Sequence, residues 1–460
     1  MSERGYVHFV GIGGSGMSAL ARILLARGAK VTGSDVRATP LVEQLRAEGA
    51  EISVGHCTEN VGEAPLVVAS SAIARENPEL LAACERGARI LGRGEMLAEL
   101  IAGYKAVAIA GTHGKTTTTA MIAGILEAAD LDPSVMIGGV RIDDETNARL
   151  GNGPWFVTES DESDGSFLHL RPTIAVITNI ENDHVANDDA MAVLLEQFET
   201  FVGHVPPDGL AVIGYDNAAS AKLARTARGA VTTFGLERGA MVRAVNVRYA
   251  GLGAEFDVEV RSEYLGTFRL SVPGEMNVQN ALAAIAVAHA IGIDAAVIAG
   301  ALAAFHGVHR RFEILSRSER MTVVDDYAHH PTAVAATIAA ARCYHDGPIV
   351  VAFQPHRYTR TAYLAANFGD ALAAADEVYL APIYAASEEP IDDVSERSIG
   401  AVLELRHHTV VRYVASVEDL GEELRKNAKP GSLVLMLGAG NITNVAHALA
   451  KALAAPAFAG

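Results

Sequence analysis

The sequence predicts an α/β protein with three α/β domains around a central cleft. Apolar β-type runs alternate with helical patterns along the chain, and in three successive stretches such runs end in glycine-rich or polar clusters. With 460 residues, of which 50% are hydrophobic and 20% charged, the chain is long enough for two to four domains with their own cores. Neither repeats nor low-complexity linkers interrupt the pattern, and three α/β units are therefore expected.

Composition excludes several classes of protein. The formal net charge of −18 argues against sequence-independent binding to nucleic acid or to an anionic membrane, because both require massed Lys and Arg. The three cysteines, Cys57, Cys84 and Cys343, are far apart and in no metal-ligand spacing, which is typical of a reducing compartment. The N-terminus lacks the long apolar segment of a signal peptide. We therefore expect a cytoplasmic protein.

The first unit begins with an apolar strand at residues 6–12 and a glycine-rich turn. This turn reads GIGGSG from Gly11 to Gly16, and a helical pattern follows at residues 17–27 before a second strand ends at Ser34 and Asp35. The pattern G-x-G-x-x-G thus occurs in a strand–helix–strand context. Its glycines allow close approach of a diphosphate, and Asp35 can accept a hydrogen bond from a sugar hydroxyl. A dinucleotide or any diphosphate-linked sugar nucleotide would fit.

A further strand of this unit is expected at residues 66–69, with Ser70 and Ser71 at its carboxyl end and Arg93 later in the chain. Open α/β sheets bind ligands at this edge, so Ser71 and Arg93 are candidate ligand contacts. The alternative is that the serines cap the next helix and that Arg93 forms a surface salt bridge.

The second unit begins near Tyr104 with the stretch AVAIAGTHGKTTTTAM at residues 106–121. A β-type run leads into a glycine turn and a helix start, where backbone N–H groups, the helix dipole and Lys115 favour phosphate. Ile109 replaces the first Gly of the full P-loop, so the loop is a shortened relative of that pattern. Such a Lys faces its ligand and is not expected in a core. The alternative is a plain strand–turn–helix with a surface Lys.

Two further strands of this unit end in polar clusters. Residues 155–164 read WFVTESDESD and end in four carboxylates, which need a cation or a basic partner unless the loop is simply solvated. The buried run at residues 173–180 is followed by ENDH, which ends in His184. Because parallel strands share one carboxyl edge, Thr116, Glu159 and His184 are expected around one Mg²⁺.

The end of the second unit carries two asparagines and two arginines. Residues 272–284 read VPGEMNVQNALAA, where Asn277 and Asn280 either cap a helix or bind a base edge. Arg310 and Arg311 lie in HGVHRRF, just before the pattern changes. We therefore expect domains at residues 1–103, 104–311 and 312–460.

The third unit again has strands that end in polar groups. A strand at residues 321–324 leads to DDYAHHP, and a strand at residues 349–353 leads to QPHRYTR. The cationic side chains of the second cluster suit a carboxylate or phosphate, since Arg offers a planar pair of donors. Strands at residues 378–380 and 433–437 complete the unit.

These motifs occur in the order seen in the Mur ligases. The chain resembles that family from Val7 to about Ile442, in GTHGKTTTT, ESDESD, TNIENDH, GEMNVQNALAA, DDYAHHP and FQPHRYTRT. With HFVGIGGSGMS and SSAI, it is most similar to the branch that adds L-alanine. The resemblance implies a Rossmann-like N-terminal domain for UDP-N-acetylmuramate, a central P-loop-type α/β domain for ATP, and a Rossmann-like C-terminal domain for the amino acid.

The activity implied by this resemblance is an ATP-dependent ligation in peptidoglycan synthesis. A phosphoryl group passes from ATP to the lactoyl carboxylate of UDP-N-acetylmuramate, and L-alanine then attacks the acyl phosphate. The implied cofactors are ATP and Mg²⁺, and the implied enzyme is a monomer or homodimer that binds neither nucleic acid nor membrane.

The resemblance also implies roles for individual residues. The sugar nucleotide is expected to contact Gly13, Gly14, Ser15, Gly16, Ser34, Asp35, Ser71 and Arg93. ATP is expected to contact Gly111, Thr112, His113, Gly114, Lys115, Thr116, Thr117, Asn280, Arg311, Asp326 and Tyr327, and Mg²⁺ to contact Thr116, Glu159 and His184. Alanine and the tetrahedral intermediate are assigned to His329, His356, Arg357 and Arg360. The catalytic set is Lys115, His113, Glu159, His184, Arg311, His329, Arg357 and Arg360.

Two departures from the family pattern and three alternatives remain. No Lys occurs from residue 116 through 221, so the carbamylated Lys of later Mur ligases has no counterpart here. Met276 stands where the family often has His.

One alternative is the recycling ligase that attaches a tripeptide to the same sugar nucleotide. The others are a nicotinamide-dependent oxidoreductase, which leaves the phosphate loop unexplained, and a nucleotide-binding protein without activity.

Overall fold

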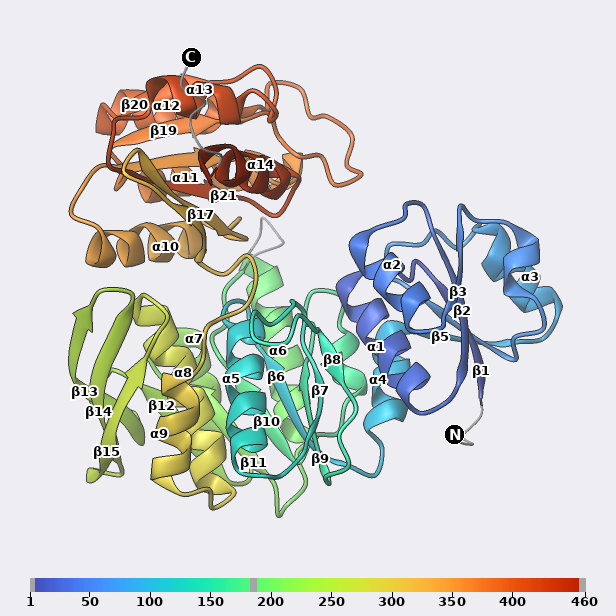
Figure 1. Cartoon of the computed structure of the whole chain (residues 1–460). Helices are drawn as coiled ribbons and strands as arrows, with labels where there is room; N and C mark the ends of the chain where they lie inside the picture. The colour runs from blue at the N-terminus through green and yellow to red at the C-terminus, as the bar shows by residue number, and fades with distance from the viewer. Residues whose placement is uncertain (1–4, 183–187, 455–460) are drawn as a thin grey trace.

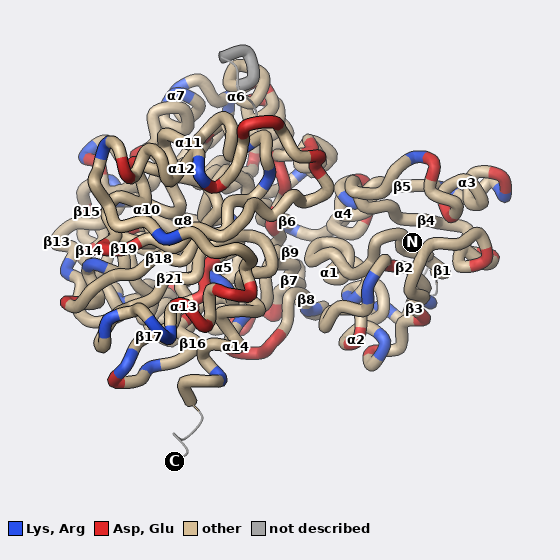
Figure 2. Tube along the Cα trace, turned by 90° about the horizontal axis from the view of Figure 1, so that it is seen from above, with Lys and Arg blue, Asp and Glu red and all other residues tan. Residues whose placement is uncertain are grey.

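The computed structural model describes residues 5–182 and 188–454, and in this part of the chain the strands form three sheets. Each sheet uses one stretch of the chain, and helices pack on its faces; we call the three parts the first, second and third unit (Figure 1). In Figure 1 the first unit lies to the right of the second, and the third lies above the second. Figure 2 shows the first unit projecting to one side. The predicted three-domain α/β architecture is confirmed, whereas the boundaries after residues 103 and 311 stay predictions.

The first unit is a parallel sheet in the order β3-β2-β1-β4-β5. Its strands are β1 (Tyr6–Val10), β2 (Lys30–Asp35), β3 (Glu51–Val54), β4 (Leu66–Ala69) and β5 (Arg89–Gly92). Its helices are α1 (Ser15–Ala26), α2 (Pro40–Ala47), α3 (Pro78–Glu85) and α4 (Arg93–Ile101). β2 and β4 pair with β1 on opposite sides, so the strand order reverses at β1. The glycine turn after β1 therefore lies at the topological switch point, where such sheets bind ligands.

The second unit has a mixed sheet in the order β15-β14-β13-β12-β11-β10-β6-β9-β7-β8. Its strands are β6 (Lys105–Ala110), β7 (Ser134–Met136), β8 (Ala148–Arg149), β9 (Trp155–Glu159), β10 (Ile174–Ile177), β11 (Leu210–Gly214), β12 (Val231–Gly235), β13 (Val242–Ala250), β14 (Gly253–Val260) and β15 (Glu263–Leu270). Its helices are α5 (Lys115–Ala128), α6 (Asp188–Gly203), α7 (Ala218–Thr226), α8 (Glu275–Ala290) and α9 (Ala295–Ala303). The antiparallel strands β13 to β15 were not predicted from the sequence.

The third unit has the strand order β16-β17-β21-β18-β19-β20, in which only the β16–β17 pair is antiparallel. Its strands are β16 (Glu313–Arg317), β17 (Met321–Asp326), β18 (Ile349–Phe353), β19 (Glu377–Leu380), β20 (Val410–Tyr413) and β21 (Ser432–Leu437). Its helices are α10 (Pro331–Tyr344), α11 (Tyr358–Leu372), α12 (Glu396–Val402), α13 (Leu420–Asn427) and α14 (Ile442–Ala454). Among the described helices of the whole chain, none is both long and apolar enough to span a membrane.

The first and second units share one apolar core, whereas the buried apolar residues of the third unit form separate clusters. One buried cluster runs from the first unit into the second and includes Leu20, Leu97, Phe156, Phe167 and Phe198. The third unit has two clusters of its own, on the two faces of its sheet. Because burial of apolar surface is the main stabilising term, a shared core holds the first and second units together. The third unit meets the second through a smaller apolar contact, in which the partly buried Leu252 and Met276 of the second unit pack on one of its clusters.

A buried carboxylate, Glu79 of α3, ties together several segments of the first unit. It accepts hydrogen bonds from the Ser34 hydroxyl (2.6 Å) and the Asn60 amide (2.7 Å), and it lies 3.1 Å from His8 Nε2. Burial alone would raise the pKa of Glu79, but the hydrogen bonds from His8, Ser34 and Asn60 outweigh burial and lower the pKa from 4.5 to about 2. The fold therefore stabilises the ionised form.

This network predicts an acid-sensitive contribution to stability. Since the folded pKa of Glu79 lies below its unfolded value of 4.5, its contribution is complete above that pH and is lost as pH falls toward 2. The difference in unfolding free energy between wild type and Glu79→Gln should shrink by about 2 kcal/mol from about pH 7 to about pH 3, measured by urea denaturation. A difference that does not change with pH would contradict the assignment.

Candidate active site

Three parallel strands of the second sheet bring their carboxyl ends to one edge. β6 pairs with β10 on one side and with β9 on the other, so that Ala110 lies opposite Ile177 and Ile109 opposite Glu159. The phosphate loop and the two polar segments after β9 and β10 therefore meet, as predicted. His184 lies outside the described residues, and its metal-binding role stays a prediction.

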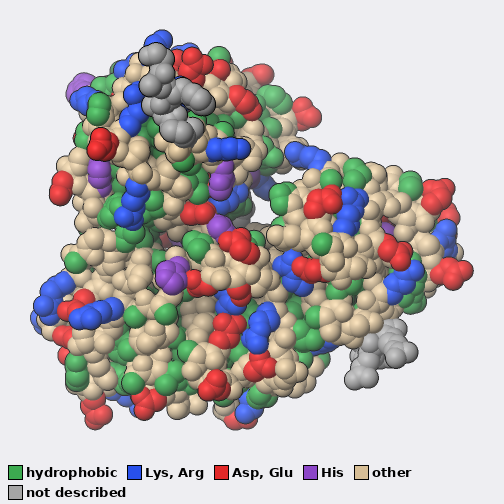
Figure 3. All heavy atoms as spheres, in the orientation of Figure 1, with side chains coloured by type: hydrophobic (Ala, Val, Ile, Leu, Met, Phe, Trp, Pro, Cys, Tyr) green, Lys and Arg blue, Asp and Glu red, His purple; other side chains and the backbone are tan. Residues whose placement is uncertain are grey.

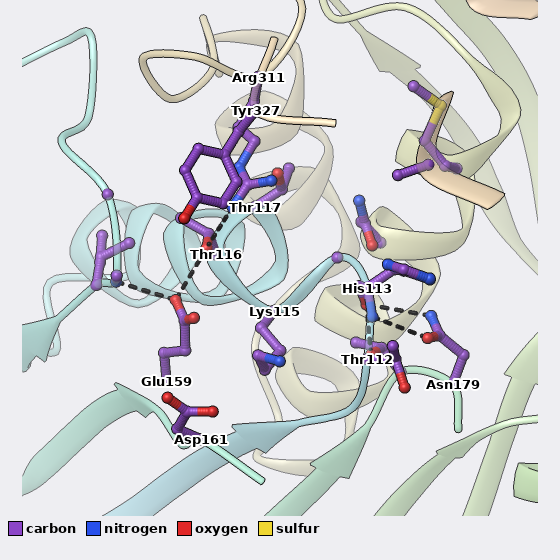
Figure 4. A pocket seen from close by; sticks show the side chains of 18 of the residues that line it. Thr112, His113, Lys115, Thr116, Thr117, Glu159, Asp161, Asn179, Arg311 and Tyr327 are labelled. Carbon is purple, nitrogen blue, oxygen red and sulfur yellow. Dashed lines mark hydrogen bonds between the residues drawn. The ribbon is translucent and has the colours of Figure 1, made fainter. Parts of the chain in front are cut away.

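The phosphate loop between β6 and α5 is held by the segment after β10. The backbone N–H of His113 donates to Asn179 Oδ1 (2.9 Å), and the Thr178 hydroxyl donates to the His113 carbonyl (2.6 Å). Gly111 has φ +124°, and a Cβ there would lie 2.2 Å from Thr178 Oγ1, so only glycine fits. Figure 4 shows Thr112 and His113 beside Asn179. These contacts hold the loop in one conformation.

Lys115, the first residue of α5, is paired with a carboxylate. Its ammonium donates to the Gly111 carbonyl (2.6 Å) and to both oxygens of Glu162 (2.9 and 2.8 Å). Burial alone would lower the pKa of Lys115, but the charges of Glu162 and Glu159 outweigh burial and raise it. The side chains of Lys115 and Glu162 are only 15% and 7% exposed. Lys115 is half-buried and belongs to none of the apolar clusters, but a buried carboxylate depends on it, and its contact with phosphate stays a prediction.

Thr116 and Glu159 present oxygen atoms to the same space. The Thr116 hydroxyl donates to Glu159 Oε2 (2.9 Å), and so does the backbone N–H of Gly138 (2.9 Å). Arg311 Nη2 donates to Thr116 Oγ1 (3.3 Å) from the segment that leads into the third unit. Figure 4 shows these side chains around one opening beside Lys115. A hydroxyl and a carboxylate are hard oxygen donors, which fit Mg²⁺.

The acidic segment after β9 is neutralised by basic side chains of two units. Arg93 of α4 donates through Nη2 to Asp161 Oδ2 (3.1 Å), Asp164 Oδ2 (3.2 Å) and Ser166 Oγ (3.1 Å), while Lys115 binds Glu162. The predicted need for basic partners is confirmed. Arg93 therefore bridges the first and second units, and its predicted contact with the sugar nucleotide stays a prediction.

The glycine turn of the first unit borders the same space as the phosphate loop through Ser15 and Gly16, whereas Gly13 and Gly14 are not in its wall. Asp35 accepts a hydrogen bond from the Gly13 N–H (2.8 Å), so its carboxylate closes the turn. Ser34 is buried against Glu79, and Ser71 lies exposed in the turn after β4. The predicted contacts of these three side chains with the sugar nucleotide stay predictions.

Asn280 of α8 packs against the phosphate loop. Its side chain accepts from the Thr118 hydroxyl (3.2 Å) and donates to Asn277 Oδ1 (3.1 Å). Gly114 has φ +83°, and a Cβ there would lie 2.3 Å from Asn280 Oδ1. Neither asparagine caps the helix, whose N-cap is Gly274. The capping alternative is therefore wrong, and the contact of Asn280 with adenine stays a prediction.

Some residues beside the loop were missed in the sequence. Asp216, after β11, accepts a hydrogen bond from Gln279 of α8 (2.9 Å), and Tyr215 and Phe234 lie next to it along the same cavity. No motif marks them. Only the rule that strand ends form the ligand edge, applied to the GYDN segment after β11, would have found Tyr215 and Asp216.

Arg311, in the link between the second and third units, lies near Asp326 and Tyr327 at the carboxyl end of β17. Asp326 accepts hydrogen bonds from the backbone N–H groups of Phe312 (2.7 Å) and Ala328 (2.7 Å). Burial raises its pKa to about 6, although Arg311 opposes this shift. The Tyr327 ring lies 5.0 Å from the Arg311 guanidinium carbon. Figure 4 shows Arg311 and Tyr327 beside Thr116, and Asp326 directly precedes Tyr327 in the chain.

The basic cluster of the third unit forms a separate group. The His329 and His356 rings are 5.7 Å apart, and Arg360 Nη1 lies 3.4 Å from His356 Nδ1. The Arg357 side chain is 46% exposed, with Nη1 4.0 Å from Glu388. The structure therefore brings His329, His356 and Arg360 together and leaves Arg357 at the surface.

One cavity of about 910 Å³ connects the three units. Its wall includes Ser15, Gly16 and Arg93 of the first unit, residues 112–117 of the second, and Asp326 to His330 of the third. Figure 3 shows the molecule hollowed where the third unit faces the other two. His329 lines the cavity, whereas His356, Arg357 and Arg360 lie beyond its wall. This volume lies at the upper end of the roughly 300–1,000 Å³ of ligand pockets, so more than one small ligand fits.

Three family models match the chain in order. They are described as the Mur ligase family, catalytic domain (residues 6–105), the Mur ligase middle domain (residues 109–288), and the Mur ligase, glutamate ligase domain (residues 310–440). The three matches correspond to the three units of the structure.

Individual relatives match over almost the full length. A UDP-N-acetylmuramate–L-alanine ligase from Geotalea uraniireducens (strain Rf4) is 45% identical over 447 residues, 97% of this chain and 98% of that protein. A ligase of the same name from Mesorhizobium japonicum is also 45% identical, over 98% of both chains. The solved UDP-N-acetylmuramate–alanine ligase from Thermotoga maritima has a TM-score of 0.83 at 30% identity, over 97% of this chain and 98% of that one. A murein peptide ligase from Psychrobacter arcticus has a TM-score of 0.72 at 26% identity, over 98% of both.

The buried pair of Lys115 and Glu162 predicts a double-mutant result. Lys115→Ala leaves a carboxylate that is 7% exposed without its cation, and loss of one partner of a buried pair costs about 3–5 kcal/mol. We expect Glu162→Gln in the same chain to recover part of this loss, measured by urea unfolding of wild type, both single variants and the double variant. If Lys115→Ala were as stable as wild type, the buried pair would be refuted.

Proposed function

The chain belongs to the Mur ligase family, and on that premise we propose that it joins L-alanine to the lactoyl carboxylate of UDP-N-acetylmuramate with consumption of ATP. This reaction belongs to the synthesis of peptidoglycan precursors. The observation that carries the proposal is the single cavity lined by the phosphate loop, the glycine turn and the polar strand end of β17. Full-length similarity to L-alanine ligases supports this substrate over the tripeptide of the recycling ligase.

The reaction has two steps. The γ-phosphoryl group of ATP passes to the carboxylate of the sugar nucleotide, and the α-amine of alanine then attacks the acyl phosphate and releases phosphate. Neither step needs a covalent bond to the protein, so the side chains contribute charge and position. Lys115 exchanges Glu162 for the β and γ phosphates, and His113 lies beside the reacting carboxylate. Arg311 neutralises charge that moves between phosphate and acyl group.

The oxygen atoms of Thr116 and Glu159 are the proposed metal ligands, together with His184. A bound Mg²⁺ supplies positive charge to the phosphate oxygens during transfer. The Thr116 hydroxyl and the Glu159 carboxylate lie 2.9 Å apart, and the Gly138 N–H holds the carboxylate in place. Arg311, which also donates to Thr116, would give up that contact or share it when the ion binds.

We assign one ligand to each of three proposed domains. Residues 1–103 bind UDP-N-acetylmuramate with Gly13 to Gly16, Ser34, Asp35, Ser71 and Arg93. Residues 104–311 bind ATP with residues 111–117 and Asn280, while Asp326 and Tyr327 reach the nucleotide from the third domain. Residues 312–460 bind alanine with His329, His356, Arg357 and Arg360, whose positive charge suits both its carboxylate and the tetrahedral intermediate.

The proposal places the enzyme in the cytoplasm, where ATP and nucleotide sugars are available. Residues of all three units of one chain line the cavity, which supports a monomer as the active form. A homodimer would serve equally well with two such cavities.

The direct test is phosphate release from ATP and Mg²⁺ in the presence of UDP-N-acetylmuramate. We expect L-alanine to be a better acceptor than glycine, L-serine or the cell-wall tripeptide, because the full-length relatives are named as L-alanine ligases. Preference for the tripeptide would assign the chain to the recycling branch. No release with any amine would refute the proposed activity.

The metal assignment is tested separately by Glu159→Gln, which keeps an oxygen acceptor for Thr116 and Gly138 but removes the charge. We expect the Mg²⁺ concentration for half-maximal phosphate release to rise roughly tenfold or more. The matched control is Glu196→Gln, an exposed carboxylate of α6 outside the cavity wall, which should leave the Mg²⁺ dependence unchanged. Equal Mg²⁺ dependence in both variants would remove Glu159 from the metal site.

A further inference from the structure

Three side chains beside the phosphate loop form a compact group, the histidine–glutamate cluster of His113, Glu181 and His330. Their donor atoms all lie within 4.8 Å of one another. His113 Nε2 is 3.1 Å from Glu181 Oε2, and His330 Nδ1 is 3.8 Å from the same oxygen. We propose that this cluster is a second divalent-metal site, that it prefers Zn²⁺ to Mg²⁺, and that its occupation inhibits the enzyme.

Two of the three ligands are already fixed on one backbone framework. His113 is held through its N–H by Asn179 and through its carbonyl by Thr178. The Thr112 hydroxyl makes two hydrogen bonds with the backbone of Glu181. It accepts from the Glu181 N–H (2.8 Å) and donates to the Glu181 carbonyl (3.1 Å). A site with fixed ligands loses little conformational entropy when the ion binds.

The third ligand comes from the third unit. His330 is the N-cap residue of α10, and its ring lies 5.1 Å from the His113 ring at an angle of 34°. Thr332 in the first turn of the same helix donates to Glu181 Oε2 (2.7 Å). Metal-ligating carboxylates are commonly oriented by such a hydrogen bond. The cluster therefore joins two units, and all three of its members line the cavity, where an ion can enter.

The donor set distinguishes this cluster from the proposed magnesium site. Two imidazole nitrogens and one carboxylate suit Zn²⁺, whereas Mg²⁺ prefers oxygen donors. Zinc–ligand distances in a tetrahedral site separate the donor atoms by roughly 3.4 Å. The two distances to Glu181, 3.1 and 3.8 Å, lie close to that value. Three protein ligands leave the fourth position to water.

Inhibition follows from where the ion would bind. It would tether His113 of the phosphate loop to His330 of the third unit, and it would occupy the imidazole that we place beside the reacting carboxylate. This consequence rests on the proposed function, but binding of the metal does not.

The test is a Zn²⁺ titration of the full-length protein against a chromophoric chelator, with Mg²⁺ in excess to saturate the magnesium site. The ligand variants are His330→Gln and Glu181→Gln, which lie in different units. The matched control is His345→Gln at the other end of α10, where Nε2 lies 2.9 Å from the Gly431 carbonyl oxygen and outside the cluster. Circular dichroism checks that each variant is folded.

We expect one Zn²⁺ to bind to wild type and to His345→Gln, and roughly tenfold or more weaker binding to both ligand variants. The Zn²⁺ concentration that halves phosphate release should rise by a similar factor in His330→Gln. Equal affinity in all four proteins, or no binding to wild type, would overturn the proposal. Zinc binding with the expected pattern in a protein without ligase activity would refute the proposed function and leave the metal site standing.

Discussion

The parallel register of β6 between β9 and β10 is the constraint on which the rest of the site depends. It places Glu159 level with Ile109, one residue before the end of β6, and it brings Thr178 and Asn179 alongside the phosphate loop. A shift of one residue would turn Glu159 to the other face of the sheet, because side chains alternate along a strand. The loop, its lysine and the proposed metal ligands are therefore positioned by backbone pairing that lies beneath the cavity. Local changes in loop sequence alone could not produce this arrangement.

Much of this arrangement was predictable because its signals are local. Glycines before Lys115, apolar runs that stop at polar clusters, and the order of motifs indicated the three units and the shared sheet edge. Contacts that join distant residues were not predictable in the same way. The pairing of Lys115 with Glu162, the bridge from Arg93 to Asp161 and Asp164, and the bond between Gln279 and Asp216 depend on tertiary packing. The antiparallel strands β13 to β15 were missed because they carry no motif, although their residues alternate between buried and exposed as half-buried strands do.

The three units differ in how firmly they are attached. A continuous apolar cluster joins the first unit to the second, and Arg93 adds a polar bridge over the same boundary. The third unit has its own cores and meets the second through residues 306–312, the edge of the cavity, and the packing of Leu252 and Met276 of the second unit against one of those cores. In that segment Arg310 and Phe312 adopt φ of +61° and +50°, a region that costs non-glycine residues about 1–3 kcal/mol each. The residues proposed to bind phosphate and sugar nucleotide thus lie in the two units that share a core, and those proposed to bind the amino acid lie in the third unit.

The carboxylate that occupies Lys115 also determines which anions can enter the phosphate loop. An incoming anion must compete with Glu162, which already lies 2.8 Å from the ammonium. A singly charged ion such as chloride would only replace the negative charge of Glu162 at Lys115 and would lose its own hydration. Its binding free energy would therefore be small. A triphosphate bound as proposed would bring several charges, and those that do not face Lys115 would lie near the N-terminus of α5 and Arg311. Under the proposed function, the pairing of Lys115 with Glu162 would therefore favour a polyanion over a small, singly charged anion at this loop.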